Sequence, residues 1–257
     1  MEGELGRGGF GRAFRCTDEF ELPMVAKYLL PRRQPKAEQR AAWEKEIALM
    51  EAVRHPHVVH LYDAFHDANR FWLVMERCDG CVRDLVEGNA TRGFRKAEVV
   101  DFGRQVLSAL NAIHAAGIIH RDLHIDNVLY TLRDGTVQLK VSDFGISKLL
   151  TEEDSEHAYT AIGRAFDVAP ELVTLGYTSQ QSDIYQTGLL LFYLLTGEPA
   201  ISSSDGPAQT VIARGLARRR AENLGTPLGD VLARMLRRRD EYRYASAMDA
   251  WRALATV

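Results

Sequence analysis

The most informative part of this sequence is the segment IHRDLHIDNVL, residues 119–129. Six of its eleven residues are polar or charged, and apolar residues enclose them at both ends. A second segment, VSDFG at residues 141–145, follows closely and adds Asp143. Together the two segments form the densest cluster of residues able to carry chemistry, so they are the first candidates for a catalytic site.

The sequence around these segments is that of an ordinary globular chain. Its 257 residues, 46% of them hydrophobic, suffice for one large domain or two fused lobes. A net charge of −3 gives no overall attraction to nucleic acid or to an anionic membrane. Two arginine runs, Arg218–Arg220 and Arg237–Arg239, lie in helix-like stretches and are interpreted as solvated faces without a function.

Neither a membrane span nor a leader is expected. The longest apolar run, Leu189–Leu195, is far shorter than the roughly 18 residues of a span, and residues 1–4 do not resemble a secretory signal. Cys78 and Cys81 have the spacing of metal and redox sites, but no second close pair completes a zinc site, so small half-buried thiols are expected. Three cysteines without a disulfide framework favour a cytoplasmic location.

The hydrophobic pattern changes character between Glu76 and Arg95. Before this point, apolar alternation predicts strands and one amphipathic helix; after it, helical periodicity dominates. The expected strands are residues 12–16, 23–30, 61–65 and 70–75, and the expected early helix is 37–53. Further on, apolar residues recur at helical spacing from Val99 to His114, and a helix that is apolar all round is expected at 184–195, inside a lobe.

A glycine-rich loop, GRGGFG at residues 6–11, stands near the start of the chain. Glycines allow backbone N–H groups to approach phosphate oxygens closely, although this pattern also marks dinucleotide-binding folds and plain turns. Residues 12–15 alternate like a strand, whereas a dinucleotide-binding loop should open a helix. The loop therefore favours a phosphate-binding site of another kind.

Lys27 lies in an otherwise apolar strand and needs an anionic partner, because an unpaired ammonium is costly to desolvate. Glu46 falls on the apolar stripe of the helix at 37–53, three residues after Trp43 and four before Met50. A carboxylate at the edge of that face could also reach solvent. The two residues are interpreted as an ion pair that aims the lysine at a phosphate.

These segments resemble the eukaryotic-type (Hanks-type) protein kinase family, and the likeness to serine/threonine kinases spans the whole chain. Ala169-Pro170-Glu171, Asp183 and Arg243 also match the family. The resemblance implies an α+β, two-lobed protein kinase fold. It has a small β-rich N-lobe with one main helix (1–75), a hinge (76–80) and a larger helical C-lobe (81–257).

The resemblance assigns a role to each matched residue. Lys27 would hold the α- and β-phosphates of ATP, and Glu46 would orient it. Asn127 and Asp143 would coordinate Mg²⁺, and Asp122 would orient the acceptor hydroxyl and take its proton. ATP would contact a larger set: Leu5, Gly6, Arg7, Gly8, Gly9, Phe10, Gly11, Ala13, Ala26, Lys27, Met75, Glu76, Cys78 and Leu129.

Other matched residues would hold the fold together. The resemblance implies that His120, Phe144, Met50 and Leu61 form a hydrophobic spine that couples the lobes. It also implies that Glu171 pairs with Arg243 deep in the helical lobe.

Two positions beside Asp122 depart from the family. His124 stands where serine/threonine kinases usually carry a lysine, and Arg164 stands where they usually carry a threonine. We hypothesise that Arg164 or a protonated His124 supplies the missing positive charge. Tyrosine kinases also lack that lysine, but the proline that they usually carry before the Ala-Pro-Glu region is absent.

The activation segment, residues 146–168, contains candidate phosphorylation sites. Thr160 occupies the usual place, three residues before Gly163, and a phosphate there could engage Arg121. Tyr159 and Ser155 are the other candidates, the acidic run 152–154 could substitute for a phosphate, and Thr160 could also be an ordinary loop residue.

The sequence thus predicts an ATP- and Mg²⁺-dependent kinase that phosphorylates Ser/Thr hydroxyls of protein substrates, with transient self-association for autophosphorylation. Two alternatives remain. Small-molecule phosphotransferases share a similar aspartate-to-asparagine loop, but they usually lack the segment that ends in Ala169-Pro170-Glu171. A pseudokinase acting as a scaffold is favoured only by the departures at His124 and Arg164.

Overall fold

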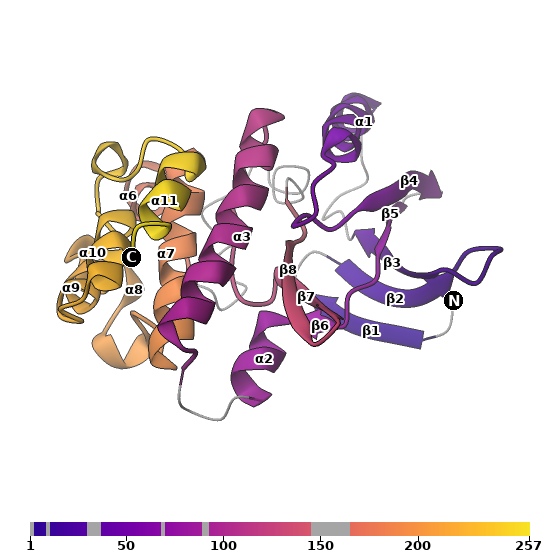
Figure 1. Ribbon diagram of the computed structural model, residues 1–257. Coiled ribbons are helices and arrows are strands. Elements are labelled where there is room, and N and C mark those ends of the chain that lie inside the picture. The colour runs from indigo at the N-terminus through magenta and orange to yellow at the C-terminus, as the bar shows by residue number, and fades with distance from the viewer. Residues whose placement is uncertain (1–2, 9–10, 30–36, 68–69, 89–92, 145–164) are drawn as a thin grey trace.

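The computed structural model describes residues 3–8, 11–29, 37–67, 70–88, 93–144 and 165–257, without the side chains of residues 37–42 and Glu46. Figure 1 shows a β-rich part at one end and a helical part at the other, with the long helix α3 between them. The chain starts in the β-rich part and ends among the helices.

The N-terminal part is built on an antiparallel five-stranded sheet in the order β1-β2-β3-β5-β4. Its strands are β1 (Gly3–Gly8), β2 (Gly11–Thr17), β3 (Pro23–Leu29), β4 (Leu61–Asp67) and β5 (Arg70–Glu76). Helix α1 (Ala37–Ala52) packs against β4. Trp43 of α1 stacks on Phe71 of β5 with ring centroids 4.6 Å apart, so the apolar stripe of the helix covers the sheet.

A small second sheet connects the two parts. It contains β6 (Gly80–Cys81), β7 (Val128–Arg133) and β8 (Thr136–Val141). Asp134 and Gly135 form the β7–β8 turn with φ values of 51° and 75°, the left-handed pair that a tight hairpin requires. The Val141 amide donates to the His57 carbonyl oxygen at 2.9 Å, which ties β8 to the segment after α1.

The C-terminal part is helical. Its helices are α2 (Val82–Gly88), α3 (Lys96–Ala115), α6 (Pro170–Leu175), α7 (Gln180–Thr196), α8 (Ala208–Ala213), α9 (Leu216–Glu222), α10 (Pro227–Met235) and α11 (Ala247–Leu254), with short 3₁₀ turns at Ser203–Asp205 and Asp240–Tyr242. Helix α7 packs against α3, α10 and α11 and is buried from Ser182 to Phe192. A helix surrounded by others needs apolar residues on every face, as its sequence predicts.

The expected elements are confirmed with small shifts at their ends. Helix α7 begins four residues before the predicted start with a polar first turn, where the Ser179 N–H donates to the Ser182 hydroxyl at 2.9 Å. Arg237–Arg239 were expected within a helix, but α10 ends at Met235, so this expectation is wrong. No helix in the described ranges is long and apolar enough to span a bilayer.

The predicted pair of Glu171 and Arg243 is present, and the four residues predicted to form the spine are all buried. Met50, Leu61 and Phe144 are buried in one hydrophobic cluster that extends across both parts, and His120 is fully buried. The Arg243 guanidinium donates to both carboxylate oxygens of Glu171, at 2.7 and 2.6 Å. Both side chains of this pair are almost completely buried, so the pair connects the start of α6 to the segment before α11 inside the helical part.

Candidate active site

The segment between α3 and β7 is held by a buried carboxylate. Asp183, in the first turn of α7, accepts the backbone N–H groups of His120 and Arg121 at 2.9 and 2.8 Å. It also contacts His114 Nε2 at 2.7 Å. Arg121 has a φ of 71°, in the left-handed region that residues with a side chain seldom adopt. Asp183 therefore stabilises a strained backbone immediately before Asp122.

The imidazole of His120 supports the same segment. Its Nε2 lies 2.9 Å from the Ser142 carbonyl oxygen, and its Nδ1 accepts the Asp122 backbone N–H at 3.3 Å. This pair of contacts requires a neutral ring with its proton on Nε2. Complete burial lowers the pKa of His120, which favours the same neutral form. With both nitrogens engaged, His120 fixes the loop rather than exchanging protons.

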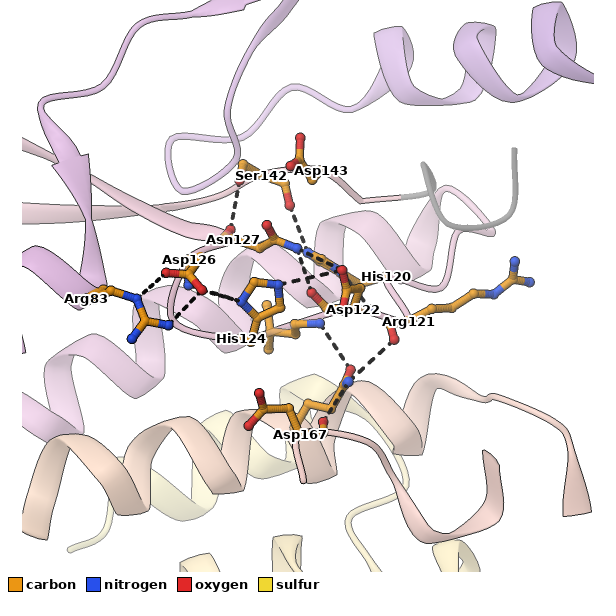
Figure 2. A network of polar contacts seen from close by, with 12 residues as sticks. Arg83, His120, Arg121, Asp122, His124, Asp126, Asn127, Ser142, Asp143 and Asp167 are labelled. Carbon is orange, nitrogen blue, oxygen red and sulfur yellow. Dashed lines mark hydrogen bonds and ion pairs between the residues drawn. The ribbon is translucent and has the colours of Figure 1, made fainter. Parts of the chain in front are cut away.

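Asp122 and Asn127 face each other across the loop, as Figure 2 shows. The Asn127 side-chain amide donates to the Asp122 carbonyl oxygen at 2.8 Å and to Asp122 Oδ2 at 3.3 Å. Ser142 donates through its N–H and its hydroxyl to the Asn127 carbonyl oxygen, at 2.8 and 2.9 Å. These bonds place Asp143, which has a φ of 60°, beside the loop.

Lys27 forms an ion pair with Asp143, which joins β3 to the segment after β8. Sequence analysis assigned Glu46 as the partner of Lys27, and the side chain of Glu46 lies outside the described residues. The contact between Lys27 and Asp143 was missed, because 116 residues separate the two in the sequence. The pair places the Lys27 amine, which is expected to bind the phosphates of ATP, next to the Asp143 carboxylate, which is expected to bind Mg²⁺.

The side-chain oxygens of Asn127 and Asp143 fit a hard cation. The Asn127 amide nitrogen donates to Asp122, so the amide oxygen is the atom of this side chain that could bind a cation. Mg²⁺ prefers oxygen ligands of this kind, from carboxylates and amides. Within the described residues no group of three or more His, Cys, Asp or Glu side chains could hold a metal ion. A Mg²⁺ ion here would therefore need oxygens from phosphate and water, which is its usual arrangement beside nucleotides.

His124 lies between two carboxylates. Its Nε2 is 3.6 Å from Asp122 Oδ2, and its Nδ1 is 3.5 Å from Asp126 Oδ2. The Arg83 guanidinium of α2 binds Asp126 with two hydrogen bonds, at 2.6 and 2.9 Å. The hydrogen bond with His124 and those with Arg83 lower the pKa of Asp126, so this carboxyl stays ionised. Sequence analysis did not identify Arg83 or Asp126.

A pocket of about 500 Å³ opens beside this part of the loop. The loop contributes residues 123–126 to its wall, and the segment before α6 contributes Phe166 and Asp167. Leu189, Leu190 and Tyr193 of α7 line another side. The pocket is thus a mixed polar and apolar recess next to Asp122, large enough for a substrate side chain.

The residues expected at ATP lie on several strands. Leu5, Gly6, Arg7 and Gly8 lie in β1, Gly11 and Ala13 in β2, Ala26 and Lys27 in β3, Met75 and Glu76 at the end of β5, and Leu129 in β7. Gly9 and Phe10 lie outside the described residues. Ala26 and Met75 are buried.

The side chains at the end of β5 are engaged in contacts of their own. Glu76 pairs with buried Lys140 of β8 at 2.9 Å, so its carboxylate fastens β5 to the second sheet. Cys78 follows in the connection between β5 and β6. Burial raises the pKa of its thiol to about 12, which keeps it protonated at neutral pH.

Gly11 and Gly6 make a matched pair for testing the glycine loop. A Cβ on Gly11 would overlap the Tyr28 carbonyl oxygen of β3, whereas a Cβ on Gly6 would meet nothing within 4 Å. We expect Gly11→Ala to lower the free energy of unfolding by about 1–3 kcal/mol, and Gly6→Ala by less than about 0.5 kcal/mol. Urea denaturation measures both. If both variants lose the same free energy of unfolding, the close approach to the Tyr28 carbonyl oxygen is not the reason for a glycine at position 11.

Four residues of the sequence-based hypotheses, Arg164, Thr160, Tyr159 and Ser155, lie outside the described residues. Neither the charge substitution by Arg164 nor a phosphate that engages Arg121 is tested by the described contacts.

Comparison with known proteins gives one consistent result. The family model described as protein kinase domain matches residues 1–253. The chain is 31% identical over 205 residues to the cell cycle serine/threonine-protein kinase CDC5/MSD2 of Saccharomyces cerevisiae, over 78% of this chain and 28% of that protein. It is 33% identical over 213 residues to the probable serine/threonine-protein kinase PknB of Lactococcus lactis, over 82% of this chain and 33% of that protein. The chain thus spans about a third of the length of these relatives.

A solved structure shows the same fold. The kinase domain of Mycobacterium tuberculosis PknI, crystallised as a double mutant, superimposes with a TM-score of 0.73 at 22% identity, over 99% of this chain and 93% of that chain. The expected α+β architecture, with a β-sheet lobe and a helical lobe, is confirmed.

Proposed function

Because the chain belongs to the protein kinase family, we propose that it transfers the γ-phosphoryl group of ATP to serine or threonine hydroxyls of other proteins. The observation that carries this proposal is the meeting of Lys27 with Asp143 beside the bonded pair Asp122 and Asn127. An amine, two oxygen ligands for a cation and a carboxylate base are the groups that phosphoryl transfer needs in one place.

Each group has a separate task in the proposed reaction. Lys27 neutralises the α- and β-phosphates, and Asn127 and Asp143 hold Mg²⁺, which supplies positive charge at the transferred group. Asp122 orients the incoming hydroxyl and accepts its proton. Glu46 orients Lys27, and the positive charge that the family places near Asp122 comes from His124 or Arg164.

The acceptor is proposed to be a protein. The pocket beside Asp122 is partly lined by Phe166 and Asp167, which lie one residue before Ala169-Pro170-Glu171. A wall made by this segment favours an extended chain over a small metabolite. The relatives' names, which describe serine/threonine-protein kinases, favour Ser/Thr over tyrosine.

The remaining assignments follow from the same function. Residues 76–80 are proposed as a hinge between lobes 1–75 and 81–257, with the backbone of Met75–Cys78 facing adenine. Since ATP is an intracellular substrate, we place the domain in the cytoplasm. Transient self-association would allow autophosphorylation of the segment that contains Thr160.

The function is tested by incubating the purified chain with γ-labelled ATP, Mg²⁺ and three peptide sets that differ only in carrying serine, threonine or tyrosine. We expect label on serine and threonine peptides, and transfer at least about a hundredfold slower by an Asp122→Asn variant. Label confined to tyrosine peptides would refute the Ser/Thr assignment. Label that appears only on aminoglycosides or choline, added in a parallel reaction, would support the small-molecule alternative instead.

A further inference from the structure

The far end of the helical lobe carries a strong local positive charge. Residues 210–239 contain eight arginines and two acidic residues, a net charge of +6, whereas the whole chain carries −3. The rest of the chain therefore carries −9. All eight of these cationic residues are arginines, whose planar guanidinium matches two oxygens of a carboxylate or phosphate at once.

Six of these arginines meet on one surface, which we call the arginine patch. Its members come from the end of α8, from α9 and from the segment after α10: Arg214, Arg218, Arg219, Arg237, Arg238 and Arg239. They line two hollows of about 320 and 340 Å³ that share Arg218 and Arg238. Sequence analysis treated the two arginine runs as separate solvated faces, but the fold brings them together.

Part of the patch has no acidic partner. Arg218 pairs with Glu222 at 2.7 Å, and Arg239 lies 3.7 Å from Glu241. Among the described residues no carboxylate forms an ion pair with the other four arginines of the patch. Within the part of the chain that the structure describes, Arg238 donates to the Ala213 carbonyl oxygen at 3.5 Å and Arg237 to that of Tyr242 at 3.4 Å. Several guanidinium groups thus remain available to an external anion.

The patch has a rigid base. The backbone carbonyl oxygens of Arg237 and Arg238 accept hydrogen bonds from buried Arg243, at 2.7 and 3.1 Å. Arg243 is in turn bound to Glu171 at the start of α6. Helix α6 also packs against α8, which ends beside Arg214. The backbone of the patch is therefore fixed to the helix that follows the activation segment, and little backbone conformational entropy would be lost on binding.

We propose that the arginine patch docks an acidic segment of the protein that this kinase phosphorylates, a proposal that rests on the proposed function. Two adjoining hollows with forked donors suit successive carboxylate or phosphoserine side chains along an extended peptide. The exposed ring of Tyr242, which lines one hollow, adds the aromatic contact that protein interfaces favour.

The surroundings of the patch favour a short acidic peptide over other polyanions. An extended nucleic acid would soon meet the remainder of the chain, whose net charge is negative. A membrane surface would need exposed aliphatic side chains, and the described lining of the two hollows offers only Tyr242, Ala213 and Gly215 besides arginines.

Docking on the helical lobe would raise the concentration of the acceptor at the active site. A substrate held at the patch presents its serine or threonine to Asp122 as an intramolecular partner, so docking lowers KM and leaves kcat unchanged.

The test uses binding and does not depend on catalysis. A fluorescein-labelled oligoglutamate peptide and a phosphoserine peptide of the same length are titrated with the Asp122→Asn chain, and anisotropy is recorded. We expect the added double substitution Arg219→Glu/Arg238→Glu to weaken binding of at least one peptide by at least about tenfold. Whichever peptide is lost identifies the anion. The matched control is Arg133→Glu, an exposed arginine on the β7–β8 hairpin.

Several outcomes would overturn the proposal. One is an equal loss of peptide affinity in the patch variant and in Arg133→Glu, and another is no binding of either peptide. A third is that oligothymidylate or phosphatidylserine vesicles bind more tightly than both peptides. A thermal melt checks that the patch variant is folded. The conservative variant Arg219→Lys/Arg238→Lys should bind with intermediate affinity, because it keeps the charge and loses the fork.

A kinetic arm links docking to the reaction. With the catalytically intact chain, the patch variant should raise KM about tenfold for a substrate that carries an acidic tail. It should leave both constants unchanged for the same substrate without the tail. If neither chain transfers phosphate, the proposed function fails while the binding data still decide whether the patch docks acidic peptides.

Discussion

Replacing Asp122 with asparagine should lower the rate of phosphoryl transfer by about a hundredfold to ten-thousandfold, the range that a general base contributes. The change keeps the size of the side chain, and ATP is expected to contact other residues, so nucleotide affinity should stay within about threefold of the wild type. Asp122 is nearly buried and is positioned by the Asn127 amide at 3.3 Å. Single-turnover transfer from ATP, with nucleotide binding measured separately, gives both quantities.

The loop contains its own control for this experiment. Asp126→Asn makes the same chemical change four residues away, at a carboxylate that binds Arg83 and borders the substrate pocket. We expect this variant to keep kcat within about tenfold and to alter KM. Comparable loss of kcat in both variants would mean that the loop as a whole, rather than the Asp122 carboxylate, accounts for the effect. Unchanged turnover in Asp122→Asn would contradict its role as the base.

Of the substitutions considered for stability, breaking the buried pair between Arg243 and Glu171 should lower the free energy of unfolding most. Arg243→Met leaves the Glu171 carboxylate buried beside Ser182 with no positive partner, at a cost of about 3–5 kcal/mol. It also removes the hydrogen bonds to the carbonyl oxygens of residues 237, 238 and 181. Urea denaturation followed by circular dichroism measures the loss as a change in the free energy of unfolding.

A double-mutant cycle separates the ion pair from its surroundings. Glu171→Met should also be strongly destabilising, but the double variant should lose less than the two single losses added together, because no charge remains unpaired. Arg252→Met, an exposed arginine on α11, should cost less than about 0.5 kcal/mol. Strict additivity in the cycle would show that the two charges do not depend on each other.

Much of the architecture could be predicted because the responsible signals are local. Alternating apolar residues gave the sheet, and the all-round apolar run gave the buried helix α7. The catalytic cluster was also found, because its polar residues are close together in the sequence. The pairing of Glu171 with Arg243 came from family resemblance alone, since 72 residues separate the two.

What escaped prediction depends on contacts between distant segments. Lys27 and Asp143 are 116 residues apart, and Arg83 and Asp126 are 43 residues apart. No periodicity in the sequence indicates that either pair meets. The arginine patch escaped for the same reason, because two runs that look like separate helix faces converge only after α9 and α10 have packed together. The end of α10 at Met235 frees the second run from the helix.

The hydrogen bonds from His120 and Arg121 to Asp183 have a consequence for the timing of catalysis. Hydrogen bonds to Asp183 in the core helix α7 offset the cost of the left-handed backbone at Arg121. This conformation therefore forms when the protein folds. The loop is therefore preorganised: it enters each turnover already shaped, and little reorganisation free energy is spent there as substrates arrive. The same connection gives the loop the rigidity of the core, so amide hydrogens at its base should exchange with solvent only when the helical lobe opens.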